Sequence, residues 1–231
     1  MESKSLQLNG ASWSVFRMGE SAWLIQPAVS DGILDLIHST TDVLERSKIH
    51  GLVDVISAYD SITLIFDSQT SDLENRIPET LPKGKQTLIA SSVTYEIEVC
   101  YELGLDWKEM EAKSGFRKDE IIEIHSSKEY TIAMTGFLPG FVFLSGLDKQ
   151  IAVSRKETPR TSVPTGSIGI GGNQTGIYSL ESPGGWQIIG RTPQSFFKID
   201  ENPPMKMKAG DKIKFVSISE NEFIEMENSS G

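Results

Sequence analysis

The chain has 231 residues, of which 38% are hydrophobic, enough to build one large domain or two ordinary ones with real cores. Its formal net charge of −10 disfavours nucleic acid and anionic membrane surfaces as partners, except at a locally positive patch. The single cysteine, Cys100, excludes an internal disulfide. The sequence has neither an apolar leader at its start nor an uninterrupted apolar run of about 18 residues, so we expect a cytoplasmic protein.

The first third of the chain predicts a small sheet with helices on one face. Short apolar and β-branched runs predict two pairs of strands, at residues 13–17 with 22–26 and at residues 52–57 with 61–66. Between the pairs, apolar residues at three- and four-residue spacing predict a helix that begins near Ser30 or Asp31 and ends by Lys48. A second helix is predicted over residues 71–77.

A polar, proline-containing stretch at residues 78–85 predicts a linker, which divides the chain into domains 1–85 and 86–231. In the second domain we expect a strand at 93–101 and two short helices capped by Asp106 and Asp119. Five short strands follow, at residues 130–134, 140–144, 167–170, 186–190 and 212–218. This series indicates a barrel or sandwich and an α+β fold class, and residues 225–231 predict a frayed tail.

The stretch from Thr135 to Pro193 differs from the rest in composition. It holds eleven of the twenty glycines and five of the ten prolines, and five cations against three carboxylates give it a local charge of +2. Its glycines and prolines favour tight turns, and its positive charge favours binding of an anion. We therefore place the functional core of the protein in this stretch.

The glycine-rich run from Gly166 to Gly176 invites comparison with phosphate-binding loops. No Lys-Ser or Lys-Thr pair follows at the spacing of a nucleotide-triphosphate loop, and Gln174 stands where the dinucleotide pattern needs its third glycine. A tight β-turn and an anion-binding loop both stay open as interpretations. Neither Ser145 nor Ser167 has the flanking glycines of an esterase nucleophile, and the three histidines lack metal-ligand spacing, so no metal site is expected.

Three arginines in this stretch sit next to residues that restrict the backbone. Arg155, Arg160 and Arg191 could bind a carboxylate or phosphate in bidentate fashion, or could make ordinary ion pairs. His125 ends a predicted helix, where it either caps the helix or faces a substrate. The aromatic turns at residues 135–141 and 182–186 are either chain reversals pinned by buried rings or the rim of a binding site.

Five ordered segments carry a family resemblance: TGFLPGFVFLSGL, RKETPRTSVPTGSIGIGG, QTGIY, SPGGWQIIGRTP and AGDKIKF. They resemble the bacterial family that contains the B subunit of 5-oxoprolinase, the kinase inhibitor KipI and the first subunit of allophanate-hydrolase-type proteins. The resemblance covers most of residues 90–218. It implies a ferredoxin-like α/β N-terminal domain followed by a cyclophilin-like β-barrel C-terminal domain, without implying prolyl isomerase activity.

The resemblance also implies a function. In the oxoprolinase system, the A, B and C subunits together open 5-oxo-L-proline to L-glutamate with ATP hydrolysis, so we expect ATP, with Mg²⁺, as co-substrate. We expect two partners, a KipA-like protein that serves as the C subunit and the A subunit, and little activity without them. Two alternatives are a complex that processes urea, allophanate or another amide, and a KipI-like inhibitor of a sensor histidine kinase.

For the site, the resemblance implies that Arg155, Arg160, Gln174 and Arg191 contact substrate or nucleotide, and that His125 acts as an acid, a base or an orienting group. Two departures from the family pattern occur. Ser154-Arg155 stands where Pro-Arg is expected, which retains the arginine, and Val142-Phe143 replaces Pro-Tyr.

Overall fold

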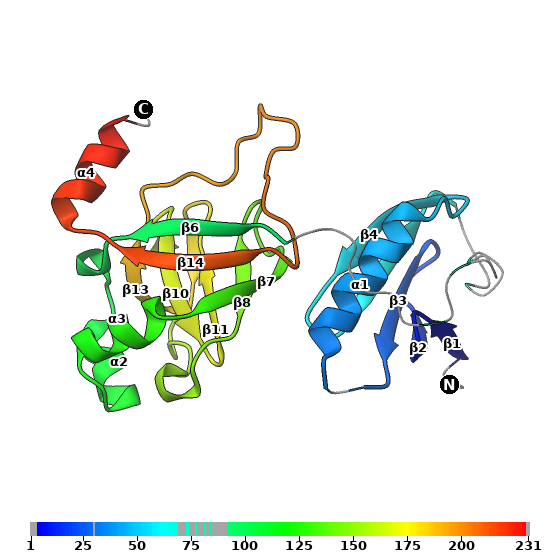
Figure 1. Ribbon diagram of the computed structural model, residues 1–231, viewed down its shortest axis with the longest axis horizontal. Coiled ribbons are helices and arrows are strands. Elements are labelled where there is room, and N and C mark those ends of the chain that lie inside the picture. Colours follow the sequence, from blue (N-terminus) through cyan, green and yellow to red (C-terminus); the bar gives the residue numbers. More distant parts are fainter. Residues whose placement is uncertain are drawn as a thin grey trace. The chain divides into compact units, whose positions relative to one another are not determined.

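The computed structural model describes residues 4–29, 31–68, 73, 77, 81, 84 and 92–229. The chain divides into two compact units, Met1–Ser91 and Ser92–Gly231 (Figure 1). The predicted domain boundary between residues 85 and 86 falls at the edge of a stretch that lies outside the described residues, as does most of the predicted linker. That boundary stays a prediction.

The first unit is built on a five-stranded antiparallel sheet with the order β1-β2-β3-β5-β4. Its strands are β1 Lys4–Leu8, β2 Ala11–Arg17, β3 Ala22–Pro27, β4 Leu52–Ser57 and β5 Ile62–Phe66. Burial alternates along β2, β3 and β5, which is why one face of this sheet forms a core while the other is polar or exposed. Both predicted strand pairs are therefore confirmed, and β1 is an addition.

The helix α1, Ile33–Arg46, packs in the same core as Trp13, Ile25 and Leu64, all of them fully buried. It begins after Gly32, whose φ of 65° is left-handed, and not after Ser30 or Asp31. The helix predicted at 71–77 lies outside the described residues, apart from two of its residues that are buried in this core, Leu73 and Ile77. The ferredoxin-like character of this domain stays a prediction.

The second unit contains a seven-stranded sheet with the order β13-β10-β11-β8-β7-β14-β6. All neighbours pair antiparallel except β14 and β6, which are parallel. Its strands are β6 Thr94–Val99, β7 Glu129–Thr135, β8 Val142–Ser145, β10 Ser167–Gly171, β11 Gln174–Ile177, β13 Gln187–Arg191 and β14 Lys212–Ser217.

The two edge strands of this sheet meet at one end. Just after β6, Cys100 donates its N–H to the carbonyl of Arg191 at 2.8 Å, and the N–H of Arg191 donates back at 3.0 Å. The sheet therefore curls on itself into a partly closed barrel, visible in Figure 1. This curled sheet fits the expected cyclophilin-like fold, and the chain as a whole is a mixed α/β protein with more sheet than helix.

Short helices and a small second sheet complete this unit. The helices are η1 Tyr101–Leu103, α2 Trp107–Ser114, α3 Lys118–Ser126, η2 Lys149–Ile151 and α4 Glu220–Ser229. The small sheet pairs β9, Arg160–Val163, with β12, Ser182–Gly184. No helix in the described part of the chain is long and apolar enough to cross a membrane.

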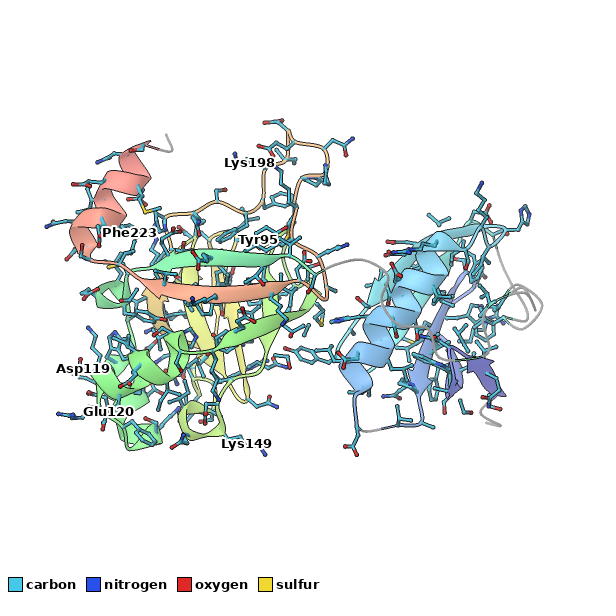
Figure 2. All side chains as sticks on the ribbon, in the orientation of Figure 1. Tyr95, Asp119, Glu120, Lys149, Lys198 and Phe223 are labelled. Carbon is cyan, nitrogen blue, oxygen red and sulfur yellow. The ribbon has the colours of Figure 1, made fainter. Side chains whose placement is uncertain are left out.

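Two predictions for the second unit are wrong. The cap residue of α3 is Arg117, and Asp119 lies inside the first helical turn. Residues 225–229 are not frayed but belong to α4. Phe223 of this helix (Figure 2) is only 3% exposed, and the Arg191 guanidinium lies 5.3 Å from the centroid of its ring. An aromatic anchor of this kind stabilises a terminal helix that local sequence alone does not favour.

Candidate functional site

The glycine-rich run forms a hairpin and not a phosphate-binding loop. Strands β10 and β11 pair directly, and Gly172, with a φ of 70°, lies in the tight turn between them. Gly171 and Gly176 lie against the indole of Trp186: a Cβ atom at Gly171 would lie 2.7 Å from the indole nitrogen. Glycine is needed here because any side chain would occupy the space of the indole.

Trp186 also lines an aromatic pocket with a volume of about 440 Å³. The two aromatic turns singled out in the sequence supply most of its wall, together with the loop that carries Arg155. The lining residues are Phe137, Leu138, Phe141, Phe143, Arg155, Pro159, Tyr178, Ser182, Pro183, Gly184, Gly185 and Trp186. Segments that are far apart in the sequence, and that carry the family resemblance, therefore form one pocket.

The rings of this pocket support one another in a fixed arrangement. Phe141 is the centre, with ring centroids of Phe143, Tyr178 and Trp186 at 4.5, 4.9 and 5.7 Å, the last two edge to face. Phe137 packs edge to face on Phe141 at 5.6 Å, yet is 66% exposed and has a φ of 69°. A bulky residue in the left-handed region is uncommon, and here it holds an apolar ring at the mouth of the pocket.

Arg155 supplies the positive charge of the pocket. Its guanidinium lies 5.6 Å from the ring centroid of Trp186, within range of a cation–π interaction. The side chain is exposed, and no ion pair joins it to another of the described residues. Because the indole orients the guanidinium without neutralising it, Arg155 is free to bind an anion.

Arg160, in contrast, is held by a carboxylate of its own chain. Its two terminal nitrogens donate to both carboxylate oxygens of Asp106, at 2.8 and 2.5 Å. Lys156 donates to Asp106 at 3.0 Å and to Glu109 at 2.5 Å. These contacts place Arg160 in an internal ion-pair network, so it does not reach the pocket as a free cation.

The network keeps its carboxylates ionised. Burial acts to raise the pKa of Asp106, but hydrogen bonds from Arg160, the backbone N–H of Ile188 and Lys156 outweigh burial and leave the pKa below its ordinary value. Hydrogen bonds from Lys113, Lys156 and Gln187 lower the pKa of Glu109 to about 2. Since Lys156 and Arg160 bracket residues 157–159, the network fixes the loop that presents Arg155.

Ser182 is a polar group of the pocket that sequence reasoning did not single out. It is 7% exposed, and its hydroxyl oxygen is buried without a hydrogen-bond partner among the described residues. A buried hydroxyl without a partner is unusual in proteins. In the sequence, Ser182 is marked only by its position at the start of the SPGGW segment. The fold is needed to show that its hydroxyl has no partner among the described residues.

His125 lies in the barrel core and not in the pocket. It is fully buried, its Nδ1 lies 2.8 Å from the Tyr101 hydroxyl, its Nε2 lies 3.0 Å from the Thr175 hydroxyl, and its ring stacks on Phe215. Burial lowers the pKa of His125 to about 3, so the imidazole is neutral at physiological pH. These contacts argue against the expected acid–base role and favour a structural one.

The two remaining candidates also lie away from the pocket. The Nε atom of Arg191 donates to the carbonyl of Thr165 at 2.8 Å, and its Nη2 pairs with Glu227 of α4 at 3.2 Å. Gln174 begins β11 beside the hairpin turn and does not line the aromatic pocket. Of the five predicted site residues, the pocket therefore contains only Arg155.

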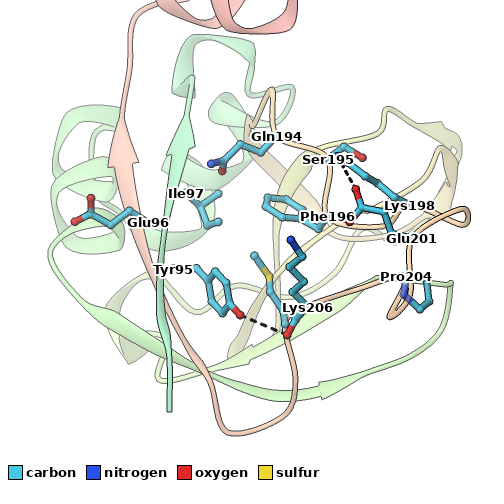
Figure 3. A pocket seen from close by; sticks show the side chains of 11 residues that line it. Tyr95, Glu96, Ile97, Gln194, Ser195, Phe196, Lys198, Glu201, Pro204 and Lys206 are labelled. Carbon is cyan, nitrogen blue, oxygen red and sulfur yellow. Dashed lines mark hydrogen bonds and ion pairs between the residues drawn. The ribbon is translucent and has the colours of Figure 1, made fainter. Parts of the chain in front are cut away.

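A second cavity, of about 510 Å³, lies between β6 and the loop that follows β13 (Figure 3). Phe196 faces Ile97 across it, and its rim carries Lys198, which pairs with Glu201 at 3.1 Å. Lys206 and Glu96 also line it, so its charged residues are two lysines and two glutamates. Their formal charges cancel, and the lining has no net positive charge that would attract an anion. We therefore prefer the aromatic pocket as the candidate site.

The aromatic pocket has no group that titrates near neutral pH. Among its twelve lining residues only Arg155 and Tyr178 are ionisable, and burial raises the pKa of the Tyr178 phenol. In the described part of the chain, no three His, Cys, Asp or Glu side chains are grouped to hold a metal ion. The pocket can bind and orient a ligand, but its own side chains supply neither a general base nor a general acid.

The structure is a mixed α/β protein in which a curled sheet is accompanied by an apolar pocket with a single cation in its lining. Comparison with known proteins identifies the family of the chain. The chain belongs to the family described as carboxyltransferase domain, subdomain C and D, whose model matches residues 13–207.

Individual relatives agree with this assignment. The B subunit of 5-oxoprolinase from Bacillus subtilis is 35% identical over 228 residues, which cover 91% of this chain and 95% of that protein. The urea amidolyase of Saccharomyces cerevisiae is 34% identical over 77 residues, which cover 32% of this chain and 4% of that protein. The crystal structure of TTHA0988 matches with a TM-score of 0.75 and 27% identity over 86% of this chain, which spans 40% of that solved chain.

Proposed function

We propose that this protein is the B subunit of an ATP-dependent 5-oxoprolinase, which works with the A and C subunits to open 5-oxo-L-proline to L-glutamate. The observation that carries the proposal is the similarity to the B subunit of 5-oxoprolinase from Bacillus subtilis along nearly the whole of both chains. A relative that is named as one subunit of an enzyme acts together with other chains. We therefore treat the pocket as part of a site that the partners complete.

The chemistry of the pocket supports a divided site. Opening a lactam needs proton transfers, and the polar side-chain groups of the pocket belong to an arginine, a tyrosine with a raised pKa, a serine and a tryptophan. Such a set can hold the carboxylate and the ring of the substrate. The groups that move protons then come from other surfaces of the assembled complex.

ATP enters the proposal as co-substrate, with Mg²⁺. The glycine-rich run is a β-hairpin covered by Trp186, so its amides do not form a loop that cradles phosphates. We therefore assign ATP to the assembled complex and not to the aromatic pocket of this chain.

The test is reconstitution of the complex from separately purified subunits. This protein alone should release almost no glutamate from 5-oxo-L-proline, whereas the complete set should release glutamate in step with ATP hydrolysis. Mixtures from which one of the three proteins is omitted serve as controls. A complete, monodisperse complex that consumes no ATP in response to 5-oxo-L-proline would contradict the proposal.

A second candidate is a complex that acts on urea, allophanate or another amide. It is favoured by the match of part of this chain to a urea amidolyase. A substrate screen of the reconstituted complex separates the two. Turnover of urea or allophanate above that of 5-oxo-L-proline would replace the first proposal with the second.

A further inference from the structure

We infer that the aromatic pocket binds the intact 5-oxoproline ring, with Arg155 holding its carboxylate and the Ser182 hydroxyl bonding its amide. This inference rests on the proposed function and adds the residues that recognise the substrate. We expect the pocket to accept other compact, flat rings that carry one carboxylate, because they fit the same geometry.

The charge of the pocket selects a monoanion. Lys156 and Arg160, the nearest other cations on the same loop, are paired with Asp106 and Glu109. Arg155 is therefore the single uncompensated charge in the lining. One planar guanidinium matches one carboxylate by two parallel hydrogen bonds, whereas a nucleotide triphosphate would need several cations or a loop of backbone amides.

Ser182 provides the second polar contact. Ser182 lines the pocket, and its hydroxyl oxygen, which is buried in the chain without ligand, lacks a partner among the described residues; it reaches a ligand by turning about the Cα–Cβ bond. A hydroxyl both donates and accepts, so it can bond either the C=O or the N–H of a lactam. Binding of the ring would satisfy a hydrogen bond that the chain itself leaves unmade, which makes the contact specific for a ligand with a polar amide.

The aromatic wall suits the flat, partly apolar ring between these two groups. Phe141 and Trp186 are 1% and 4% exposed and meet edge to face, so both rings are held in place before a ligand binds. Their rigidity lowers the entropy lost on binding. The volume of about 440 Å³ lies within the range of small-molecule pockets.

Arg160 then acts as a positioning residue. Its bidentate contact with Asp106, and the contact of Lys156 with the same carboxylate, anchor both ends of the segment next to Arg155. The Arg155 guanidinium itself lies over the ring of Trp186. Loss of Arg160 should therefore weaken ligand binding only through movement of this loop.

The experiment is calorimetric titration of 5-oxo-L-proline into the full chain, alone and mixed with its partner subunits. Loss of a charge-assisted contact in Arg155→Ala should weaken binding about tenfold to a hundredfold, and loss of a neutral one in Ser182→Ala about threefold to tenfold. The ring without a carboxylate, 2-pyrrolidinone, should bind wild type and Arg155→Ala equally. Arg117→Ala and Ser127→Ala, which remove an exposed arginine and an exposed serine beside α3, should leave affinity unchanged.

Equal affinity of wild type and Arg155→Ala overturns the inference, as does the absence of 5-oxo-L-proline binding by wild type both alone and in the complex. The proposed function is tested separately by turnover. If the complex forms glutamate and Arg155→Ala leaves its KM for 5-oxo-L-proline unchanged, the pocket assignment fails and the function stands. If binding depends on Arg155 but the complete complex forms no glutamate, the function fails and the assignment stands.

Discussion

Asp106 and Arg160 form a two-point ion pair, with both carboxylate oxygens accepting from the two terminal guanidinium nitrogens at 2.5 and 2.8 Å. The Asp106 side chain is 3% exposed, and it also accepts from the backbone N–H of Ile188 at 2.7 Å. The pair therefore ties the loop before β9 to strand β13 and to the start of α2. An arginine expected at a ligand is instead part of the scaffold that presents the ligand site.

Replacing Arg160 with alanine should destabilise the barrel unit. The change leaves Asp106 buried with Lys156 as its remaining cation, and breaking a buried pair in this way costs about 3–5 kcal/mol. Urea unfolding at neutral pH measures the loss. Arg117→Ala, which removes an exposed pair with Glu120, should cost under about 1 kcal/mol. An Arg160→Ala variant with wild-type stability but lost ligand affinity would return Arg160 to the binding site.

Glu109 should make the stability of this unit sensitive to acid. Its folded pKa of about 2 lies below the ordinary value of 4.5, so the carboxylate contributes stability above about pH 4.5 and loses it as the pH falls towards 2. The side chain is 35% exposed, and solvent screening keeps the contribution under about 1 kcal/mol. Glu109→Gln should flatten the curve of unfolding free energy against pH in this window. A mutant curve that parallels the wild type would refute the assignment.

His125 should also lower stability on acidification, over a window that begins nearer neutral pH. The unfolded imidazole takes up a proton below about pH 6.5, whereas the folded one stays neutral until about pH 3. Stability should therefore fall as the pH drops from 6.5 to 3, by about 1.4 kcal/mol per pH unit well inside the window. Unfolding free energies of His125→Gln, measured with urea across this pH window, should show a shallower slope than those of wild type.

The same variant tests catalysis. Because both ring nitrogens of His125 are bonded inside the core, a folded His125→Gln chain should support turnover in the complex within about threefold of wild type. The folded fraction is matched by circular dichroism before the assay. A loss of more than about a hundredfold in kcat would restore the acid–base role implied by the family resemblance.

Arg191 should control the terminal helix and not the ligand. It pairs with Glu227, and its guanidinium lies 5.3 Å from the Phe223 ring, so Arg191→Ala should loosen α4 by about 1 kcal/mol. Amide hydrogen exchange should rise within residues 220–229 and stay constant in β10 and β11. Lys198→Ala, at an exposed pair on the loop after β13, is the matched control. A fall in affinity for 5-oxo-L-proline without faster exchange would contradict this role.

Local patterns were enough to predict most of the strands and helices, because periodicity reports which face of an element is buried. The β1–β2 hairpin was missed although Asn9-Gly10, both with positive φ, is a strong hairpin signal. The polar composition of residues 220–229 hid α4, since its stability depends on Phe223 packing beside Arg191 across the fold.

The candidate site was predictable as a segment of the sequence but not as a set of contacts. Turn residues and aromatics pointed to the segments that line the pocket. Which arginine is free depends on where Asp106 and Glu227 lie, and these are 54 and 36 residues away from their partners Arg160 and Arg191. The same limit applies to Ser182, because only the folded chain shows that no described group bonds its hydroxyl.

Gly171→Ala should damage the pocket by displacing the indole of Trp186, which lines it. A Cβ atom at this position would lie 2.7 to 2.8 Å from three atoms of the Trp186 indole, closer than van der Waals contact permits. The indole must therefore shift, which should cost about 1–3 kcal/mol of stability and also move the ring on which Arg155 rests. Both losses can be measured by urea unfolding and by titration with 5-oxo-L-proline. Gly19→Ala, where nothing lies within 4 Å of the new atom, should change neither. If Gly171→Ala binds the ligand with wild-type affinity, the indole is not part of the recognition surface, and the glycines serve strand packing alone.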